Sequence, residues 1–237
     1  MRHAGRIIAP VSEARRRPGD RVRALLGLST CNLSDALDQL GLEGAPHGIH
    51  PLWPGCPKIA GRVMTMKLLP PDPSAGDKSS PVEGTLTAIS KAAPGDILVI
   101  DHGGRIDVNS FGGIAAWSAF HRGLVGVVID GVTRDIDEMK PAGFPAFGRG
   151  VVQQSIRGRC RFGGYGAPVT LSGVTVRTGD YLLADDNGVV IVAEGRVDEA
   201  AALAAAKLLS EERIKAAIAR GTDPLTAHRQ GRYEKGS

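Results

Sequence analysis

Apolar side chains recur at helical spacing along much of the chain. Positions three or four residues apart lie on one face of a helix, so a repeat of this period indicates a helix packed against a core. The pattern begins near Arg21, and Gly41 and Gly221 follow two of the repeats as residues that end a helix. It predicts helices over residues 21–26, 30–40, 86–92, 114–122 and 196–220, with a helical turn after Arg134.

A second pattern predicts strands. Residues 59–69 alternate well enough between apolar and polar side chains for a strand. Four shorter stretches are continuous apolar runs, which are typical of strands buried on both faces: 97–100, 125–129, 181–184 and 189–192. Because the predicted helices and buried strands alternate, we expect an α/β domain with a mixed sheet.

The same patterns divide the chain into three parts. Residues 1–19 carry no periodic apolar pattern and are expected to form an N-terminal arm. The α/β domain is expected over residues 20–221, followed by a C-terminal tail over 222–237. Glycine and proline concentrate in residues 44–57 and 70–82, which predicts two loops.

The composition is that of a globular protein. The chain has 237 residues, 42% hydrophobic and 23% charged, with 29 basic and 25 acidic side chains for a net charge of +4. These proportions argue against disorder, and no apolar run approaches the roughly 20 residues of a membrane-spanning helix. Residues 1–17 lack the apolar core of a signal peptide, and the three cysteines are widely separated. We therefore expect a cytoplasmic protein with no disulfide framework and no membrane partner.

The basic residues form local clusters, at Arg15 to Arg17 and at Arg157, Arg159 and Arg161. Proteins that bind single-stranded nucleic acid interleave basic residues with aromatic ones for base stacking, and aromatics make up only 4% of this chain. A solvated charged surface accounts for the same clusters. A nucleic-acid partner is therefore not expected.

Two adjacent glycines, Gly112 and Gly113, stand at the start of the predicted helix over residues 114–122. Asn109 or Ser110 is expected to cap this helix. Because the glycines carry no side chains, a carboxylate can approach the first amides of the helix, where unpaired N–H groups and the helix dipole favour an anion. The alternative is that both glycines only permit tight packing of the helix on the sheet.

A predicted buried strand leads into an acidic turn between Gly126 and Glu138. The ends of strands in open α/β sheets are the usual place for a ligand crevice. Asp135 is therefore a candidate oxygen ligand for a hard divalent cation completed by water, and Arg134 is a candidate clamp for a carboxylate or carbonyl oxygen. Taken alone, an adjacent Arg and Asp are more often a surface ion pair.

The two segments are related by a spacing, because twenty residues separate Gly113 from Arg134-Asp135 and two more precede Glu138. This spacing, set between an apolar helix and a buried strand, resembles the family of the regulator of ribonuclease activity A. That family also contains the 4-hydroxy-4-methyl-2-oxoglutarate/4-carboxy-4-hydroxy-2-oxoadipate aldolases. Further phrases similar to the family's occur in family order within residues 26–221: LSDAL from Leu33, GRVMT from Gly61, PGDILV from Pro94, FPAF from Phe144 and ADDNGVV from Ala184.

The resemblance implies a mixed-sheet α/β sandwich that assembles as a trimer, or as a hexamer made of two trimers, with active sites at the subunit interfaces. In the family's aldolases a Mg²⁺ or Mn²⁺ ion holds the pyruvyl end of a 2-keto acid. By this resemblance Asp135 is the metal ligand, with water at most of the remaining positions. Arg134 binds the substrate's carbonyl or hydroxyl oxygen and stabilises the developing enolate.

The resemblance also implies how the rest of the substrate is held. The backbone at Gly112, Gly113, Ile114 and Ala115 forms the substrate site, and the amides of Ile114 and Ala115 hold the pyruvyl carboxylate. In such aldolases a glutamate from the C-terminal helix of a neighbouring subunit supports the water shell of the metal. Glu211 matches that position, and Glu212 is the adjacent alternative.

Gly113 departs from the aldolase pattern, which has an acidic residue here to help a water take the substrate's hydroxyl proton. Aldol cleavage needs such a base, whose contribution is about 10²–10⁴-fold. Decarboxylation of oxaloacetate does not, because only the enolate has to be stabilised. The glycine therefore favours a decarboxylase or a changed substrate. Replacement bases to consider are Asp101, His102, Asp107 and His121.

The leading hypothesis is thus a divalent-metal-dependent lyase that cleaves a carbon–carbon bond of a 2-keto acid and releases pyruvate, as a class II aldolase, an oxaloacetate decarboxylase, or both. The alternative from another class is a non-catalytic regulator that binds a ribonuclease or another protein. The presence of both Arg134 and Asp135 argues mildly against it, because a pure binder has no need for a metal carboxylate. A third possibility is a hydratase or isomerase that uses the same enolate chemistry.

Overall fold

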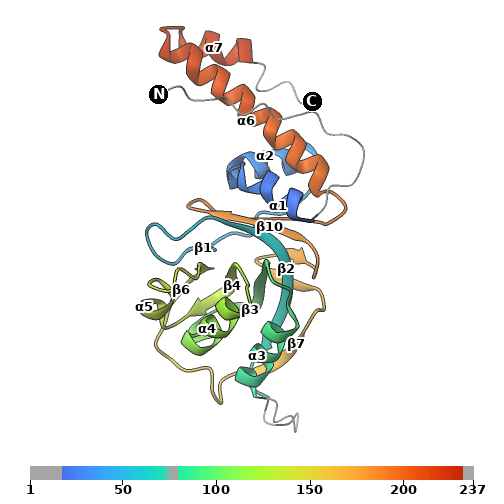
Figure 1. Cartoon of the computed structure of the whole chain (residues 1–237), viewed down its shortest axis with the longest axis vertical. Coiled ribbons are helices and arrows are strands. Elements are labelled where there is room, and N and C mark those ends of the chain that lie inside the picture. The colour runs from blue at the N-terminus through green and yellow to red at the C-terminus, as the bar shows by residue number, and fades with distance from the viewer. Residues whose placement is uncertain (1–17, 73, 75–79, 232–237) are drawn as a thin grey trace.

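The computed structural model describes residues 18–72, 74 and 80–231 (Figure 1). Most of the predicted N-terminal arm and the end of the predicted C-terminal tail lie outside the described residues. Figure 1 shows a body built around one large, strongly curved sheet, from which a long C-terminal helix rises.

The main path of the sheet runs in the order β1-β5-β4-β3-β2-β10-β11. Its parallel centre consists of β2 (Ile59–Leu69), β3 (Asp96–Asn109) and β4 (Gly126–Thr133). β10 (Tyr181–Asp185) pairs antiparallel with β2, and β11 (Gly188–Val192) pairs antiparallel with β10. The predicted α/β fold with a mixed sheet is therefore confirmed.

Six short strands complete the structure and were not predicted. β5 pairs parallel with β4, β6 with the end of β4, and β7 antiparallel with the end of β2. β8 and β9 form a separate hairpin. All six are too short or too exposed to produce an apolar repeat: β1 (His50–Pro51), β5 (Ala146–Gly148), β6 (Gly150–Val151), β7 (Arg161–Tyr165), β8 (Val169–Leu171) and β9 (Val174–Val176).

Two apolar clusters cover the sheet. The larger joins the central strands to α3 (Pro81–Lys91) and α4 (Gly113–His121). The smaller lies where α1 (Pro18–Leu26), α2 (Thr30–Gln39) and α6 (Val197–Ala219) pack on β10 and β11. Strands covered on both faces become apolar at successive positions, and all eight residues of β4 are buried.

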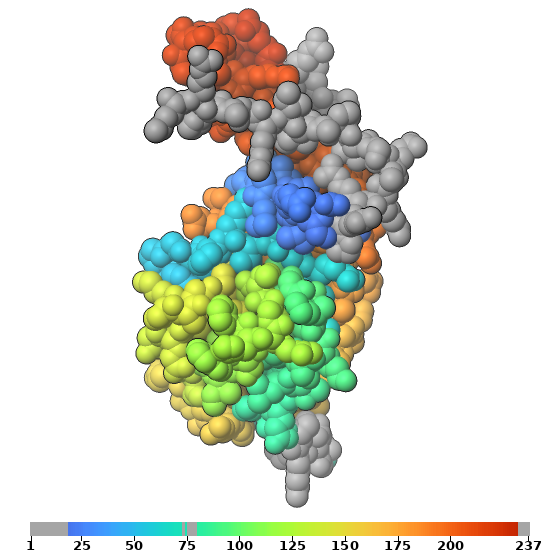
Figure 2. Space-filling view, viewed as in Figure 1, coloured from blue at the N-terminus to red at the C-terminus, as the bar shows by residue number. Residues whose placement is uncertain are grey.

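α6 extends beyond the body, and Figure 2 shows its far half with α7 as a separate protrusion. α7 (Pro224–Gly231) lies within the predicted C-terminal tail. Asp223 accepts a hydrogen bond from the Thr226 amide, as an N-cap does, and the Ser210 hydroxyl donates to the Gly231 carbonyl at 2.7 Å. In the part of the chain that the structure describes, no helix has both the length and the apolar character to cross a bilayer.

Several predicted boundaries differ from the structure, and β4, for example, runs to Thr133 instead of residue 129. α3 begins at Pro81 rather than at residue 86, because the Ser80 hydroxyl caps the amide of Glu83 and proline favours the first helical position. β3 continues past residue 100 to Asn109 through an irregular stretch in which Gly103 and Gly104 have positive φ. The register shift there interrupts the apolar pattern, which hid the second half of the strand.

Gly44 provides a test of the packing between α2 and β11. A Cβ at this position would collide with the carbonyl oxygen of Ile191 and with the Leu37 side chain. Since a carbonyl in the sheet cannot move independently, we expect Gly44→Ala to lower the free energy of unfolding by about 1–3 kcal/mol. Gly195→Ala is the control, because nothing lies within 4 Å of its Cβ. Urea denaturation measures both, and equal stability of the two variants would contradict this packing.

Candidate functional site

A cavity of about 360 Å³ lies where β3 and β4 end and α4 begins. β3 and β4 are parallel neighbours, so their carboxyl ends meet at one edge of the sheet. β3 leads into α4, and β4 leads into the short helix α5 (Ile136–Met139). The backbone of residues 112–115 and both Arg134 and Asp135 line this cavity, so the fold brings the two predicted segments together.

Asp135 joins the two segments directly. Its Oδ2 accepts a hydrogen bond of 2.8 Å from the amide of Gly113, the first residue of α4. The residue before it, Gly112, is the N-cap and has no side chain to offer, so a carboxylate from a different segment satisfies this amide. Its negative charge also lies at the positive end of the helix dipole.

The predicted cap by Asn109 or Ser110 is wrong. The Ser110 hydroxyl donates to the Val132 carbonyl at 3.0 Å, and its amide donates to the same oxygen. The Asn109 amide nitrogen Nδ2 donates to the Phe111 carbonyl at 3.2 Å. Ser110 therefore ties this segment to β4 and Asn109 stabilises the segment locally, three and four residues before the helix starts.

Arg134 and Asp135 form an ion pair inside the cavity. Nε of Arg134 lies 3.3 Å from Oδ2 of Asp135, and about a third of each side chain is exposed, at 36% and 34%. Asp135 adopts the left-handed conformation with φ of 59° and ψ of 36°, which Asp tolerates better than most residues. This backbone turn directs the carboxylate back toward α4. The pair is thus part of the cavity wall rather than a pair on the outer surface.

The two glycines leave room for carboxylates. A Cβ on Gly112 would lie 2.8 Å from Oδ2 of Asp135, and one on Gly113 would collide with the carboxylate of Glu138. The first hydrogen bond inside α4 runs from the Ala116 amide to the Gly112 carbonyl. The amides of Ile114 and Ala115 therefore belong to the first turn, where no helical carbonyl is available to them.

The oxygen atoms of Asp135 indicate which kind of cation would fit the cavity. Both contacts to its carboxylate involve Oδ2, and no hydrogen bond from the described residues reaches Oδ1. Within residues 18–72, 74 and 80–231 there is no group of three or more His, Cys, Asp or Glu side chains placed to hold a metal. One or two carboxylates completed by water fit Mg²⁺ or Mn²⁺ better than Zn²⁺, which takes nitrogen and sulfur ligands.

The four residues considered as replacement bases do not line this cavity. Asp101 is paired with Lys67 at 3.0 Å, and Asp107 is paired with Arg105 at 2.7 Å. His121 packs on Trp117 at the other end of α4, with ring centroids 4.5 Å apart. β3 and the far end of α4 therefore hold these groups away from the cavity.

His102, the fourth, is buried within the irregular stretch of β3. Its Nε2 donates to the Val108 carbonyl at 3.0 Å, since a carbonyl oxygen can only accept. Burial lowers the pKa of His102, although the hydrogen bond to Val108 acts in the opposite direction. The neutral ring is thus a structural group of the β3 turn.

Glu211 lies on α6, outside the cavity of its own chain. Its Oε2 accepts a hydrogen bond of 3.1 Å from Asn32 of α2. Figure 1 shows α6 on the side of the sheet edge that carries β10, whereas α4 and α5 lie on the body below it. A role for Glu211 at the cavity therefore requires a second subunit, as the sequence resemblance implied.

Several cavity residues were not identified from the sequence. Thr85 and Leu86 come from α3, and Ser155, Ile156 and Arg157 come from the loop after β6. Arg157 was noticed only as part of a basic cluster, and Glu138 only as the end of a spacing. Nothing in the local pattern marks these residues, because only the packing of α3 and of the loop against α4 brings them to the cavity.

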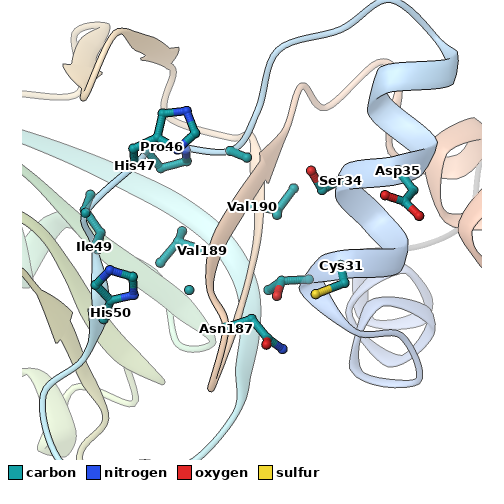
Figure 3. Close-up of a pocket in the computed structure, with 14 residues that line it drawn as sticks. Cys31, Ser34, Asp35, Pro46, His47, Ile49, His50, Asn187, Val189 and Val190 are labelled. Atoms are coloured by element: carbon teal, nitrogen blue, oxygen red, sulfur yellow. The ribbon is translucent and has the colours of Figure 1, made fainter.

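A second cavity, of about 310 Å³, lies between α2, the loop that carries His47 and His50, and the start of β11 (Figure 3). Cys31 and Ser34 line it from α2, and Asn187 lines it from the turn before β11. None of the residues predicted to bind substrate or metal lines this cavity. The residues predicted to bind substrate therefore line the cavity at α4 and not this one.

Comparison with known proteins identifies relatives of the whole domain. The sequence model of the RraA-like family (Aldolase/RraA) matches residues 30–191. Protein DlpA of Legionella pneumophila is 32% identical over 214 residues, which are 90% of this chain and 34% of DlpA, so the chain spans about a third of that relative. A candidate 4-hydroxy-4-methyl-2-oxoglutarate aldolase of Halalkalibacterium halodurans is 30% identical over 200 residues, covering 84% of this chain and 89% of the relative.

Solved structures share the fold. An uncharacterized protein from Pseudomonas syringae superimposes with a TM-score of 0.82 at 30% identity, over 95% of this chain and 100% of its own. RraAS2 of Streptomyces coelicolor, described as an unusual member of the RNase ES inhibitor RraA family, superimposes with a TM-score of 0.74 at 27% identity, over 83% and 97%. The α/β architecture is therefore that of RraA-like proteins.

The buried neutral His102 predicts how stability depends on pH. An unfolded histidine has a pKa of about 6.5, and the folded value is lower, so the unfolded state binds the proton first as the pH falls. The contribution of His102 to the free energy of unfolding is complete above a pH of about 6.5 and is lost as the pH falls through the lower pKa of the folded state. We expect His102→Gln, which can still donate to the Val108 carbonyl, to make stability less sensitive to pH between about 7.5 and 5. Denaturation curves across this pH range measure the effect. If the free energy of unfolding depends on pH in the variant as it does in the wild type, the assignment is wrong.

Proposed function

This chain belongs to the RraA-like family (Aldolase/RraA), and from that membership we propose that it is a divalent-metal-dependent lyase. The proposed reaction cleaves a carbon–carbon bond of a 2-keto acid and releases pyruvate. The substrate is a hydroxylated keto diacid such as 4-hydroxy-4-methyl-2-oxoglutarate, or oxaloacetate. Relatives named as candidate aldolases of this type support the proposal.

One contact carries the proposal, the hydrogen bond of 2.8 Å between Oδ2 of Asp135 and the amide of Gly113. It holds a carboxylate and the adjacent Arg134 beside the first amides of α4, in one cavity. A cation site and an anion site are thus neighbours. A 2-keto acid requires this arrangement, because its carbonyl and carboxylate oxygens are adjacent.

Asp135 would hold a Mg²⁺ or Mn²⁺ ion through Oδ1, with water at most of the other positions. The fit rests on the all-oxygen donor set and on the absence of a contact to Oδ1 from the described residues. When bound, such an ion acts as a Lewis acid that stabilises the enolate of pyruvate. Asp135 is held in place for this role by the Gly113 amide, whatever the side chain binds.

The chain's own residues supply the remaining electrostatics. The amides of Ile114 and Ala115 bind the pyruvyl carboxylate at the start of α4. The guanidinium of Arg134 binds the keto oxygen and stabilises the negative charge that develops there when the bond breaks. Since the helix and the ion pair exist before substrate binds, neither interaction requires rearrangement.

A trimer would complete the site with Glu211 of the neighbouring subunit. The outer face of α4 supports an interface, because Ile114, which lines the cavity, and Trp117 and Phe120 farther along the helix are 71%, 63% and 45% exposed. Large apolar side chains gathered in this way are typical of a surface that a partner covers. Glu211 lies beside Asn32 of α2 and not at the cavity of its own chain, so it could serve only the cavity of a neighbouring subunit.

The alternative function is that of a non-catalytic regulator, since RraAS2 is described as a member of an RNase ES inhibitor family. The exposed face of α4 would then bind a protein of another kind. A pull-down that recovers a ribonuclease, from protein that binds no Mn²⁺, would favour the regulator. The position of the Arg134–Asp135 ion pair in the wall of the cavity favours the lyase.

Pyruvate release provides the direct test. We expect the purified protein with Mg²⁺ or Mn²⁺ to produce pyruvate from oxaloacetate, from 4-hydroxy-4-methyl-2-oxoglutarate, or from both, in an assay coupled to lactate dehydrogenase. Asp135→Asn keeps the left-handed turn and the acceptor for Gly113 but removes the charge, so kcat/KM should fall by about 100-fold or more. Mn²⁺ affinity should fall with it, and activity equal to that of the wild type would disprove the proposal.

Mixing two inactive variants tests the contribution of Glu211 from a neighbouring subunit. Asp135→Asn and Glu211→Gln should each be impaired, because each damages every interface of a homotrimer. In randomly mixed trimers about one quarter of the interfaces would pair an intact Asp135 with an intact Glu211, so activity should return on mixing. Glu212→Gln is the control and should stay active. If reassembled trimers recover no activity, Glu211 does not serve a neighbouring cavity, and its role is the contact with Asn32 in its own chain.

A further inference from the structure

Arg157 lines the cavity from a segment that neither α4 nor β4 supplies. It belongs to the loop after β6, which reaches the cavity with Ser155, Ile156 and Arg157. The sequence phrases similar to the RraA-like family stop at Phe147 and resume at Ala184, so the loop lies between them. This wall of the cavity is therefore outside the segments that carry the resemblance to the family.

The backbone of this loop is held by its own contacts. Ile156 is only 6% exposed and belongs to the larger apolar cluster. The Ser155 hydroxyl accepts a hydrogen bond of 3.3 Å from the Arg157 amide. The Asn109 amide at the end of β3 donates to the Gln154 carbonyl at 3.0 Å, which ties the loop to the strand that leads into α4. A ligand that binds Arg157 therefore has to order little more than one side chain.

The guanidinium of Arg157 differs from its neighbours in what it contacts. Arg134 is paired with Asp135 at 3.3 Å, and Nη1 of Arg159 donates to the Ser155 carbonyl at 3.1 Å. The side chain of Arg157 is exposed, and from the part of the chain that the structure describes no hydrogen bond or ion pair reaches its guanidinium. Its N–H donors are thus left to a ligand.

The rest of the lining indicates which kind of ligand this is. Much of the wall is apolar and comes from Val82, Leu86, Phe111 and Ile156. These side chains offer no hydrogen bond to an anion, whereas a guanidinium binds a carboxylate through two parallel N–H donors. A keto diacid brings two carboxylates into the cavity, and the first amides of α4 account for only one of them. The second carboxylate needs a cation of its own.

We propose that Arg157 determines specificity by binding the second carboxylate of a diacid substrate, at the end far from the keto group. The proposal rests on the proposed lyase function, in which the amides of Ile114 and Ala115 hold the pyruvyl carboxylate. It gives the two guanidinium groups of the cavity separate tasks, because Arg134 acts at the keto oxygen and Arg157 at the far end. The substrate class is thus a 2-keto acid with a second carboxylate.

Two analogues that cannot undergo aldol cleavage test this assignment by binding alone. 2-Oxoglutarate carries the second carboxylate, 2-oxopentanoate has a methyl group in its place, and both lack the hydroxyl group that cleavage requires. In calorimetric titrations of the Mg²⁺-loaded protein, we expect 2-oxoglutarate to bind about 10- to 100-fold more tightly, as hydrogen bonds between charged groups do. Arg157→Leu should remove this preference by weakening the binding of 2-oxoglutarate alone.

Two further variants show whether the paired donors at this position are responsible. Arg157→Lys keeps the positive charge without the planar fork of donors, so it should retain an intermediate preference for 2-oxoglutarate. Arg177→Leu removes the same charge from the exposed turn before β10, which does not line the cavity, and should keep the full preference. If Arg177→Leu loses the preference as Arg157→Leu does, the net charge of the protein causes it and the proposal is wrong.

Turnover provides a second comparison of the same kind. 4-Hydroxy-4-methyl-2-oxoglutarate and 4-hydroxy-4-methyl-2-oxopentanoate differ by the same replacement of a carboxylate by a methyl group, and aldol cleavage of either releases pyruvate. We expect Arg157→Leu to lower kcat/KM for the diacid by about 10- to 100-fold and to leave kcat/KM for the monoacid within about threefold of the wild type. Equal losses on both substrates would contradict a role at the second carboxylate.

The outcomes separate this proposal from the proposed function. A wild type that does not bind 2-oxoglutarate, or that binds the two analogues equally, would overturn the role of Arg157 even if pyruvate is released from other substrates. The same conclusion follows if Arg157→Leu keeps the preference. A wild type that prefers 2-oxoglutarate through Arg157 but releases pyruvate from no substrate would overturn the lyase and leave Arg157 as part of a diacid-binding site.

Discussion

The candidate site depends on one hydrogen bond, in which the carboxylate of Asp135 accepts from the amide of Gly113. The two residues follow neighbouring parallel strands, so the contact ties the turn after β4 to the helix after β3. It also satisfies an amide that the helix cannot pair and places negative charge at the positive end of its dipole. Arg134, Glu138 and the free amides of α4 are all positioned relative to this contact.

The backbone makes that contact possible in two ways. Asp135 takes a left-handed conformation, which turns its side chain toward α4 instead of along the direction of β4. Gly112 and Gly113 have no Cβ atoms, so the two carboxylates can come close to the helix backbone. The sequence left two uses open for these glycines, anion approach or helix packing on the sheet. In the fold, the space beside them holds the carboxylates of the protein's own residues.

The position of α6 explains why one chain does not make a complete site under the proposed function. α6 packs on α1 and α2, and its far end extends beyond the body with α7. Glu211 lies against Asn32 of α2, away from the cavity. The exposed apolar face of α4 and the projecting helix are features of one chain that a neighbouring copy would use. The assembly and the chemistry are therefore linked in this proposal.

The sequence by itself determined the long elements and supplied the candidates for the site residues. Residues 59–69, 114–122 and 189–192 were predicted nearly to their observed limits, because periodicity reports burial on one face or on both. The spacing between Gly113 and Arg134 indicated the candidate site, since α4 and β4 together fill the interval between these residues. Only the tertiary structure decided which groups meet there. Packing between segments places Glu138 against Gly113, brings Arg157 to the cavity from a distant loop and holds His102 outside it. Contacts of that kind leave no local period in the chain.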